Sequence, residues 1–308
     1  MNTQKNIMSV DLEDYFCDLP FSEWVSYESR IEETTDVILE LFEKYNVTAT
    51  FFSLGYIAEK FPHLIEKICS LGHEIASHGY SHLDLRKISK DDFESDLIKS
   101  IKILEKISKE KVLGFRAPFF SVNSKNTWVF DILQKHVTYD SSIFPVRTPL
   151  YGIPYAPRFI YKMKTQNPFE KNNDGTLLEI PPATFHFPIF GNIPIAGGFH
   201  WRFLPLFIIQ MGIKKLNRDG YPAMCYIHPK DLDENMPRIS QYGRQYYWGL
   251  KKSLKKFESI LKNFEFSSAR DMIENDDSWK IFLCSIINKD LWSKMVIVNV
   301  TNDIKKNY

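Results

Sequence analysis

Short apolar runs alternate with helical patterns along most of this 308-residue chain. For example, the β-branched and aromatic run at residues 47–54 (VTATFFSL) precedes a helical pattern at residues 56–71. Strands that alternate with helices in this way form parallel βαβ units, because two parallel strands need a long crossover connection between them. The alternation therefore predicts an α/β protein with a parallel core sheet.

The predicted strands span residues 7–12, 47–54, 74–77, 112–116, 137–141, 177–180, 221–228 and 264–266. The predicted helices span residues 31–45, 56–71 (with Pro62 in an early turn or kink), 91–109, 124–133, 247–264 and 267–273. Residues 145–200 are rich in Pro, Gly and aromatic residues and have little periodicity, which predicts long loops or a small β insertion there. The apolar stretch 203–211 is too short to span a membrane, and we expect it to be buried rather than to contact a membrane or a lipid carrier. We expect one catalytic domain over residues 1–275 and a C-terminal extension, residues 276–308, that packs on it.

Polar residues follow several of the predicted strands at the point where each strand ends. They are Asp11, the pair His78 and His82, Arg116 and Asp140. In parallel α/β folds, ligands bind at the carboxyl ends of the strands. The recurrence predicts one site at this end of the sheet.

His78 and His82 stand four residues apart, immediately after a short buried strand. In a helical turn, residues at this spacing face the same side, and two neutral imidazoles can bind one metal ion. A histidine pair is often only part of a polar surface, so the interpretation as a metal site depends on further ligands elsewhere in the chain.

Composition narrows the classes of function. A formal net charge of +1 argues against binding to nucleic acid through bulk charge. No apolar run is long enough to cross a membrane, and the N-terminus does not have the pattern of a secretory signal. The four cysteines are scattered, as in a protein with reduced thiols. We therefore expect a cytoplasmic protein.

Several motifs together resemble the polysaccharide deacetylase family, carbohydrate esterase family 4. They are SVDLEDYF at 9–16, SHGYSH at 77–82, FRAPFFS at 115–121, YDSSIFP at 139–145, GGFHWRFLP at 197–205 and YIHPKDLD at 226–233. SVDLEDYF looks like the branch of this family found near exopolysaccharide and O-antigen gene clusters. The resemblance implies a distorted (β/α) barrel with fewer than eight strands and metal-dependent removal of N-acetyl groups from amino sugars. It also implies a divalent metal ion, with Zn²⁺ expected first and Co²⁺, Ni²⁺ or Mn²⁺ as alternatives.

The resemblance also implies roles for individual residues. Asp11 matches the catalytic base, and His228 matches the general acid that protonates the leaving amine. Arg116 matches the arginine that orients the base, and we expect Asp140 to be its charge partner. The backbone at Phe119 is expected to stabilise the oxyanion.

The metal ligands implied by the resemblance are His78, His82 and one carboxylate. Strand alternation places Glu13 on the side of Asp11, whereas Asp14 has the shorter side chain that is usual in the family but needs the strand to end or bulge. Both remain candidates. A weaker expectation is that Asp271 hydrogen-bonds to His228.

The substrate side is expected to involve Phe119, Gly198, His200, Trp201 and Arg202. The expected substrate is an N-acetylated saccharide, with lipid-linked and nucleotide-linked forms among the candidates. Two other functions compete with this hypothesis. One is an allantoinase-like amide hydrolase that acts on a non-sugar substrate, and the other is a catalytically silent carbohydrate-binding module.

Overall fold

The computed structural model describes residues 5–189 and 191–275. Met1–Ala269 form one compact unit, and the chain from Arg270 onward belongs to a second unit. The second unit includes most of α9 (Ala269–Asn275). The predicted extension over residues 276–308 lies outside the described residues. The fold that positions the site is that of the first unit.

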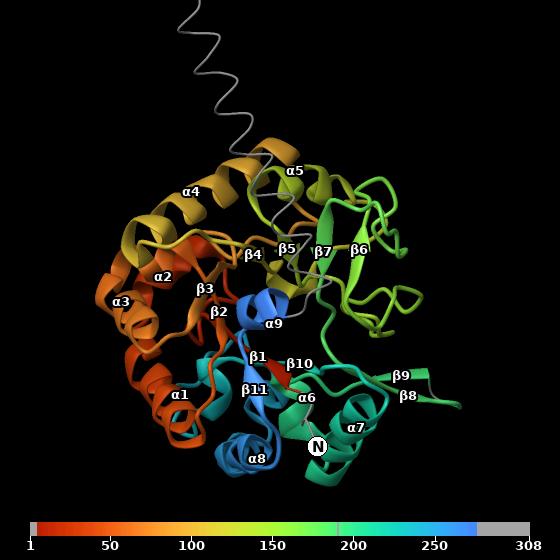
Figure 1. Cartoon of the computed structure of the whole chain (residues 1–308). Coiled ribbons are helices and arrows are strands. Elements are labelled where there is room, and N and C mark those ends of the chain that lie inside the picture. The colour runs from red at the N-terminus through yellow and green to blue at the C-terminus, as the bar shows by residue number, and fades with distance from the viewer. Residues whose placement is uncertain (1–4, 190, 276–308) are drawn as a thin grey trace, which may run out of the picture. The chain divides into compact units, whose positions relative to one another are not determined.

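A curled sheet forms the centre of this unit (Figure 1). Its strands are β1 (Asn6–Leu12), β2 (Thr50–Ser53), β3 (Glu74–Ser77), β4 (Gly114–Phe115), β5 (Tyr139–Asp140), β6 (Tyr161–Met163), β7 (Leu177–Glu179), β10 (Met224–Ile227) and β11 (Phe266–Ser267). Their order is β10-β1-β2-β3-β4-β5-β7-β6, with β11 paired to β1, and all pairings are parallel except that of β6 with β7. Seven parallel strands thus follow one another from β10 to β7, which confirms the predicted fold class.

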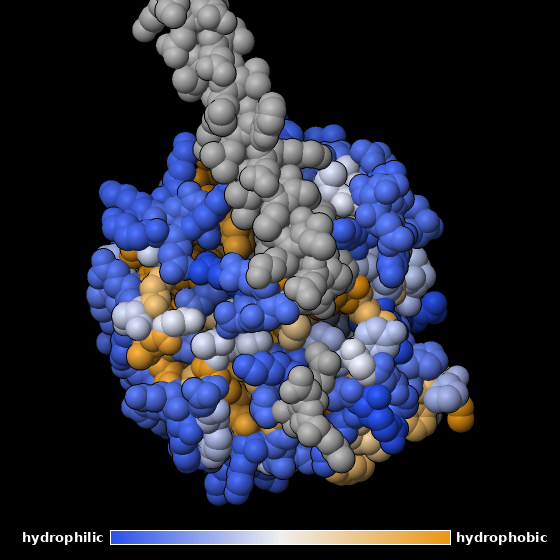
Figure 2. Space-filling view, viewed as in Figure 1, coloured by the Kyte–Doolittle hydropathy of each residue, from blue (hydrophilic) through white to orange (hydrophobic). Residues whose placement is uncertain are grey.

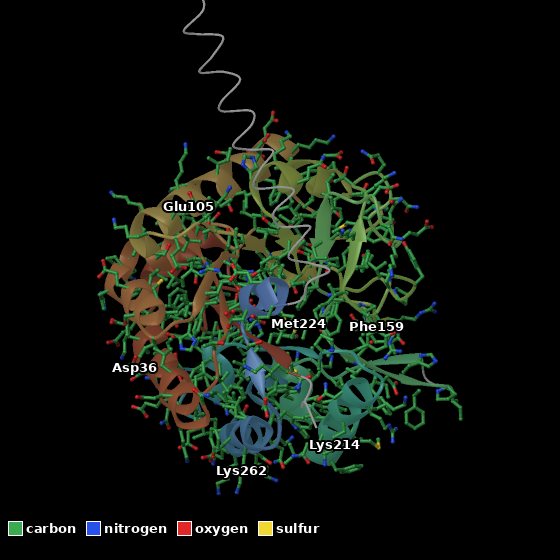
Figure 3. The ribbon with its side chains drawn as sticks, in the orientation of Figure 1. Asp36, Glu105, Phe159, Lys214, Met224 and Lys262 are labelled. Atoms are coloured by element: carbon green, nitrogen blue, oxygen red, sulfur yellow. The ribbon has the colours of Figure 1, made fainter. Side chains whose placement is uncertain are left out.

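Helices surround the sheet. They are α1 (Ile31–Tyr45), α2 (Gly55–Lys60), α3 (Pro62–Ser70), α4 (Lys90–Ser108), α5 (Trp128–His136), α6 (Gly198–Phe203), α7 (Leu206–Arg218) and α8 (Leu250–Asn263). Figure 3 labels three residues on the surrounding helices, Asp36 on α1, Glu105 on α4 and Lys262 on α8. Met224 on β10 lies inside the ring that these helices form. All seven residues of β1 are buried, as expected for a parallel strand that is covered on both faces.

The helix predicted over residues 56–71, with Pro62 in an early turn or kink, is divided into α2 and α3 at Phe61, because the residue before a proline avoids the helical conformation. The kink at Pro62 is thus confirmed. The prediction missed α6 and α7. The buried residues of α7 (Ile209, Gly212, Ile213 and Leu216) do have helical spacing and were the available signal.

The predicted insertion at residues 145–200 is confirmed. In it, β6 and β7 join the main sheet, while β8 (Thr184–Phe187) and β9 (Gly191–Pro194) form a separate antiparallel hairpin. Hydrophobic side chains are visible at the tip of this hairpin and beside α7 (Figure 2). Within the part of the chain that the structure describes, no helix has both the length and the apolar character needed to cross a bilayer.

Candidate metal and active site

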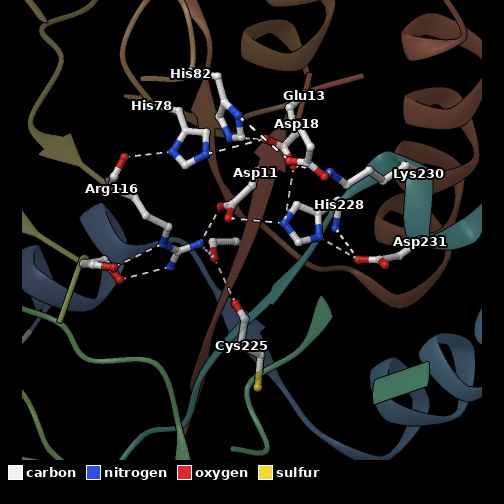
Figure 4. A network of polar contacts seen from close by, with 12 residues as sticks. Asp11, Glu13, Asp18, His78, His82, Arg116, Cys225, His228, Lys230 and Asp231 are labelled. Carbon is white, nitrogen blue, oxygen red and sulfur yellow. Dashed lines mark hydrogen bonds and ion pairs between the residues drawn. The ribbon is translucent and has the colours of Figure 1, made fainter. Parts of the chain in front are cut away.

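The carboxyl ends of β1, β3, β4 and β10 bring the predicted polar residues other than Asp140 together with His228 (Figure 4). Asp11 lies near the end of β1, His78 follows β3, Arg116 follows β4 and His228 follows β10. These strands are neighbours in the sheet, with β2 between β1 and β3. The parallel pairing is therefore what turns scattered positions in the sequence into one site.

An irregular loop, rather than the expected helical turn, holds the two histidine rings together. Their centroids are 5.2 Å apart. Nδ1 of His78 lies 2.8 Å from the carbonyl oxygen of Arg116, and Nδ1 of His82 lies 2.9 Å from that of Cys17. A carbonyl oxygen only accepts, so each Nδ1 carries the proton and donates it. In the neutral form of each ring, Nε2 is thereby left with a lone pair, which is the tautomer that binds a metal ion.

Glu13 completes this cluster. Its Oε2 atom lies 2.5 Å from Nε2 of His82 and 3.8 Å from Nε2 of His78. One ligand atom from each of the three residues lies within 4.8 Å of the others. Oε2 of Glu13 is buried and accepts no hydrogen bond of good geometry among the described residues. A buried carboxylate oxygen in this condition, facing two imidazole lone pairs, fits a divalent cation such as Zn²⁺.

The charges around the cluster are mutually dependent. Burial raises the pKa of Glu13, but the neighbouring His82 and Lys230 hold it well below its ordinary value. Burial lowers the pKa of His78 to about 4. Burial also acts to lower the pKa of His82, but Glu13 and Asp18 together raise it above its ordinary value. His78 is therefore neutral at pH 7, as a metal ligand must be.

Asp14 points away from the histidines, so its candidacy as a metal ligand was wrong. Its carboxylate accepts hydrogen bonds from the backbone N–H groups of Tyr15 and Arg30 and from the Ser29 hydroxyl. These contacts fix the start of α1. Because β1 ends at Leu12 and the chain turns, the two adjacent carboxylates have different tasks.

Asp11 is held by Arg116, as the resemblance implied. The guanidinium Nη1 lies 2.5 Å from Oδ1 of Asp11 and donates to the Ser9 hydroxyl at 3.0 Å. Its Nη2 donates to the Ser141 hydroxyl at 3.0 Å. Arg116 is fully buried, and its guanidinium lies 4.2 Å from the centre of the Phe52 ring. The arginine thus occupies one oxygen of Asp11 and fixes the orientation of the carboxylate.

Asp140 is not the charge partner of Arg116, and it is not among the residues that line the cavity beside the cluster. Its carboxylate accepts hydrogen bonds from the backbone N–H and the hydroxyl of Ser142. In the sheet it stands opposite Glu179, and burial raises the pKa of both carboxyl groups. Two buried carboxyl groups side by side share a proton more easily than they both ionise. The sequence did not show that the neighbour of Asp140 would be another acid.

His228 is oriented by Asp231. Nδ1 of His228 donates to Oδ2 of Asp231 at 2.7 Å, and the other oxygen of Asp231 lies 2.9 Å from Nε of Arg202. Burial acts to lower the pKa of His228, but Asp231 and Glu13 together raise it above its ordinary value. Nε2 of His228 lies 3.7 Å from Oδ2 of Asp11. The carboxylate at Nδ1 is therefore Asp231 and not Asp271, the residue expected there.

A cavity of about 470 Å³ opens beside the cluster. Asp11, Glu13, His78, His82 and His228 line its polar floor. Aromatic residues line the rest, and they include Phe119, Phe120, Tyr151, Phe199, Tyr226 and Tyr246. The φ angle of Phe119 is +59°, a conformation that is uncommon for any residue with a side chain. Such backbone strain tends to occur at functional sites.

Of the residues expected on the substrate side, Phe119 and Arg202 line this cavity, and Gly198, His200 and Trp201 do not. The guanidinium of Arg202 is bound by Asp231. Trp201 is part of the core, where its indole N–H donates to the carbonyl of Ile195. The ring of His200 packs between those of Phe144 and Phe199.

Gly198 has a packing role. A Cβ atom at this position would lie 2.9 Å from the ring of Tyr226 and 3.2 Å from Cε1 of His228. Its φ angle is +54°, which also favours glycine. The glycine therefore lets the start of α6 approach the site histidine, rather than providing a surface for a sugar.

The sequence prediction missed the role of a buried lysine, Lys230. Nζ of Lys230 lies 2.6 Å from Oε1 of Glu13 and 2.9 Å from Oδ2 of Asp18. The hydroxyl of Tyr246 donates to the same oxygen of Asp18. Burial lowers the pKa of Lys230, but the two carboxylates raise it well above its ordinary value. Lys230 and Asp231 both lie within the YIHPKDLD motif. The motif therefore indicated that this segment belongs to the site, but not which side chains its residues contact.

Two family models match parts of this chain. Residues 21–135 match the family model for polysaccharide deacetylase, and residues 141–274 match a model for a domain of unknown function, DUF3473. The histidine pair and Arg116 lie within the first match, and His228 lies within the second.

A peptidoglycan-N-acetylglucosamine deacetylase of Bacillus cereus is 39% identical over 87 residues, which are 28% of this chain and 32% of that protein. The chain spans about a third of the length of the curated relatives that it matches first. These relatives are named as deacetylases, which are hydrolases that act on amides.

Two solved structures share the fold. A Mycobacterium smegmatis protein, provisionally described as a polysaccharide deacetylase, has a TM-score of 0.57 at 18% identity, over 87% of this chain and 90% of that one. Puue allantoinase has a TM-score of 0.55 at 15% identity, over 86% of this chain and 87% of that one. Residues 21–135 of this chain thus match the polysaccharide deacetylase family model, and the curated relatives that match a segment of similar length are named as deacetylases.

Proposed function

We propose that this chain is a metal-dependent N-deacetylase that removes the acetyl group from an N-acetylated amino sugar. The single observation that carries the proposal is the cluster of Glu13, His78 and His82, whose ligand atoms lie within 4.8 Å of one another beside Asp11 and His228. The SVDLEDYF motif favours a glycan precursor of cell-surface polysaccharide synthesis as the substrate, either lipid-linked or nucleotide-linked.

Glu13, His78 and His82 are the residues that would hold the metal ion. A divalent ion, with Zn²⁺ expected first, would polarise the acetyl carbonyl and make a water molecule more acidic. Lys230 binds Oε1 of Glu13, so Oε2 is the oxygen directed to the histidines. The lysine thus orients the carboxylate.

Asp11 is the base in this proposal. Arg116 occupies its Oδ1, and Oδ2 faces the cavity and His228. Oδ2 accepts one proton from the attacking water as the oxygen of that water bonds to the acetyl carbon. The fixed guanidinium keeps the carboxylate of Asp11 correctly turned for this transfer.

His228 is the acid. Asp231 holds the proton on Nδ1, so Nε2 is the atom that faces the substrate. A proton given by Nε2 to the amide nitrogen lets the C–N bond break, and acetate and the free amino sugar leave. Arg202 supports this arrangement through Asp231.

The shape of the cavity suits a sugar. Its volume of about 470 Å³ lies in the range of small-molecule sites, and its walls combine aromatic faces with a few polar groups. Aromatic faces can pack against the apolar faces of a sugar ring. Phe119 would bring a backbone N–H to the oxyanion, as the resemblance implies.

The test is acetate release by the purified, zinc-loaded chain from N-acetylated chito-oligosaccharides, with allantoin as a parallel substrate. We expect acetate from the saccharide and no hydrolysis of allantoin. His78→Ala and His82→Ala should abolish both bound metal and acetate release, while His63→Ala, which replaces an exposed histidine on α3, should change neither. Hydrolysis of allantoin alone, or full metal occupancy in both site variants, would contradict the proposal.

A second experiment tests the acid. His228→Ala should slow hydrolysis of the amide much more than hydrolysis of an activated acetyl ester, whose leaving group needs no proton. Equal losses on the two substrates would show that His228 has another role.

A further inference from the structure

An exposed apolar surface surrounds one side of the cavity mouth. We call it the apolar rim and define it by Phe199, Phe203, Phe207, Met211 and Trp248. Their exposed fractions are 40%, 59%, 66%, 43% and 61%. The rings of Phe199 and Phe203 stack at 5.9 Å, and those of Phe203 and Trp248 lie 6.4 Å apart. Exposed hydrophobic side chains gathered in this way mark an interaction site more often than a chance arrangement.

The core does not need these side chains. On α7, the buried face is formed by Ile209, Ile213 and Leu216, and Gly212 packs closely against Ile195. Phe207 and Met211 are one helical turn apart on the opposite side, toward solvent. The helix thus carries a second apolar stripe, which corrects the expectation that residues 203–211 are buried.

The rim is continuous with the proposed active site. Phe199 lines the cavity, and so does Leu150, which is 73% exposed. Arg202 and Tyr246 also line the cavity and lie next to the rim in the chain. Whatever covers the rim therefore lies at the cavity mouth.

Cations accompany the rim. Residues 198–263 contain twelve Lys and Arg but only five Asp and Glu, although the whole chain has a net charge of +1. On α7, Lys214 and Arg218 continue the exposed face that begins with Phe207 and Met211.

On α8, the exposed cations are Lys251, Lys252 and Lys255, which follow Trp248. This helix lies beside the rim, since Nζ of Lys256 donates to the carbonyl oxygens at the end of α6.

We propose that the apolar rim and these cations bind an anionic phospholipid bilayer. Aromatic side chains enter the boundary between headgroups and acyl chains, and Lys and Arg bind the phosphates. A second copy of the chain would bring like charges together, and nucleic acid offers no apolar layer for the five exposed hydrophobic side chains of the rim. The inference does not depend on the chemistry proposed above. If both hold, the cavity opens toward a substrate carried at the membrane surface.

The test is sedimentation of the full chain with vesicles of phosphatidylcholine alone or mixed with phosphatidylglycerol. We expect binding to the mixed vesicles and little binding to phosphatidylcholine alone. The triple variant Phe203→Ser, Phe207→Ser, Trp248→Ser should lose binding. Reversing Lys251, Lys252 and Lys255 to Glu should weaken it roughly a hundredfold or more, because each basic residue near an anionic surface contributes about a factor of five.

Matched controls lie elsewhere on the surface. Val25→Ser and Leu71→Ser replace exposed hydrophobic residues, and Lys102→Glu with Lys106→Glu reverses charges on α4. These controls should bind vesicles like the parent chain, and all variants should keep the parent melting temperature within a few degrees. Equal binding to both kinds of vesicle would overturn the proposal. So would undiminished binding by both the Phe203/Phe207/Trp248 variant and the Lys251/Lys252/Lys255 variant. Acetate release from a soluble saccharide, measured in the same variants, separates failure of vesicle binding from failure of the proposed activity.

Discussion

Replacing Glu13 should weaken metal binding, whereas replacing the adjacent Asp14 should lower the stability of the metal-free protein. In the structure, Glu13 faces His78 and His82, whereas Asp14 accepts hydrogen bonds near the start of α1. We therefore expect Glu13→Gln to lose the metal ion and Asp14→Asn to keep it. Both changes remove one negative charge and preserve shape, so each is the control for the other.

The expected stabilisation by the metal ion can be worked out for both proteins. At a metal concentration of about 100 times the dissociation constant, binding stabilises the parent chain by about 2.7 kcal/mol. Loss of a ligand that weakens binding about 100-fold would leave only about 0.4 kcal/mol at the same concentration. For a domain of this size, the metal-induced rise in melting temperature should fall from roughly 5–11 °C in the parent to about 1–2 °C in Glu13→Gln.

Asp14→Asn should act on the metal-free protein instead. Its carboxylate accepts from two backbone N–H groups and one hydroxyl, and an amide can accept with only one oxygen. Hydrogen bonds to a charged group contribute about 1.5–3 kcal/mol each, and the remaining amide oxygen keeps part of this contribution. We therefore expect the free energy of unfolding to fall by about 1–3 kcal/mol. The metal-induced shift should stay at the parent value.

The assay is thermal unfolding followed by circular dichroism, with and without added Zn²⁺, together with metal content after dialysis. Retention of the metal-induced shift in Glu13→Gln, combined with its loss in Asp14→Asn, would refute the assignment of Glu13 to the cluster.

Three further changes test other parts of the site. Asp231→Asn should lower the deacetylation rate by about 10²-fold or more while leaving metal content unchanged, because His228 loses the carboxylate that holds its tautomer and its raised pKa; unchanged kcat with a raised KM would point to substrate binding instead. Lys230→Met should destabilise the metal-free protein by about 3–5 kcal/mol in thermal unfolding, because it removes a buried cation from Glu13, yet it should enlarge the metal-induced shift, since a positive charge beside the metal is lost; a smaller shift would contradict this. The pKa of Glu179 is raised in the folded state, so the stability that this residue contributes is present below the ordinary carboxyl pKa and is lost as pH rises toward the raised value. Glu179→Gln should therefore become more stable relative to the parent as pH increases over that interval. A difference in denaturant unfolding that stays constant with pH would refute this prediction.

The order of the secondary structure was largely predictable because it depends on local patterns. Buried parallel strands appear as apolar runs, and amphipathic helices repeat every three to four residues. The prediction failed where a local pattern has two meanings. The stretch 203–211 is apolar, yet part of it faces solvent, because α7 has hydrophobic residues on two faces.

The sequence by itself determined which segments carry the site, since Asp11, His78, Arg116 and His228 each follow an apolar run that must be a strand. It could not determine which side chains would touch. Asp14 and Glu13 are adjacent, and only the turn after β1 directs one to the histidines and the other to α1.

Asp140 and Glu179 are 39 residues apart and become neighbours only through the pairing of β5 with β7. Lys230 reaches Glu13 across 217 residues because β10 and β1 are adjacent in the sheet. Contacts of this kind depend on strand order and on the path of each loop, which are properties of the whole fold, whereas strands, helices and motifs depend on residues close together in the chain.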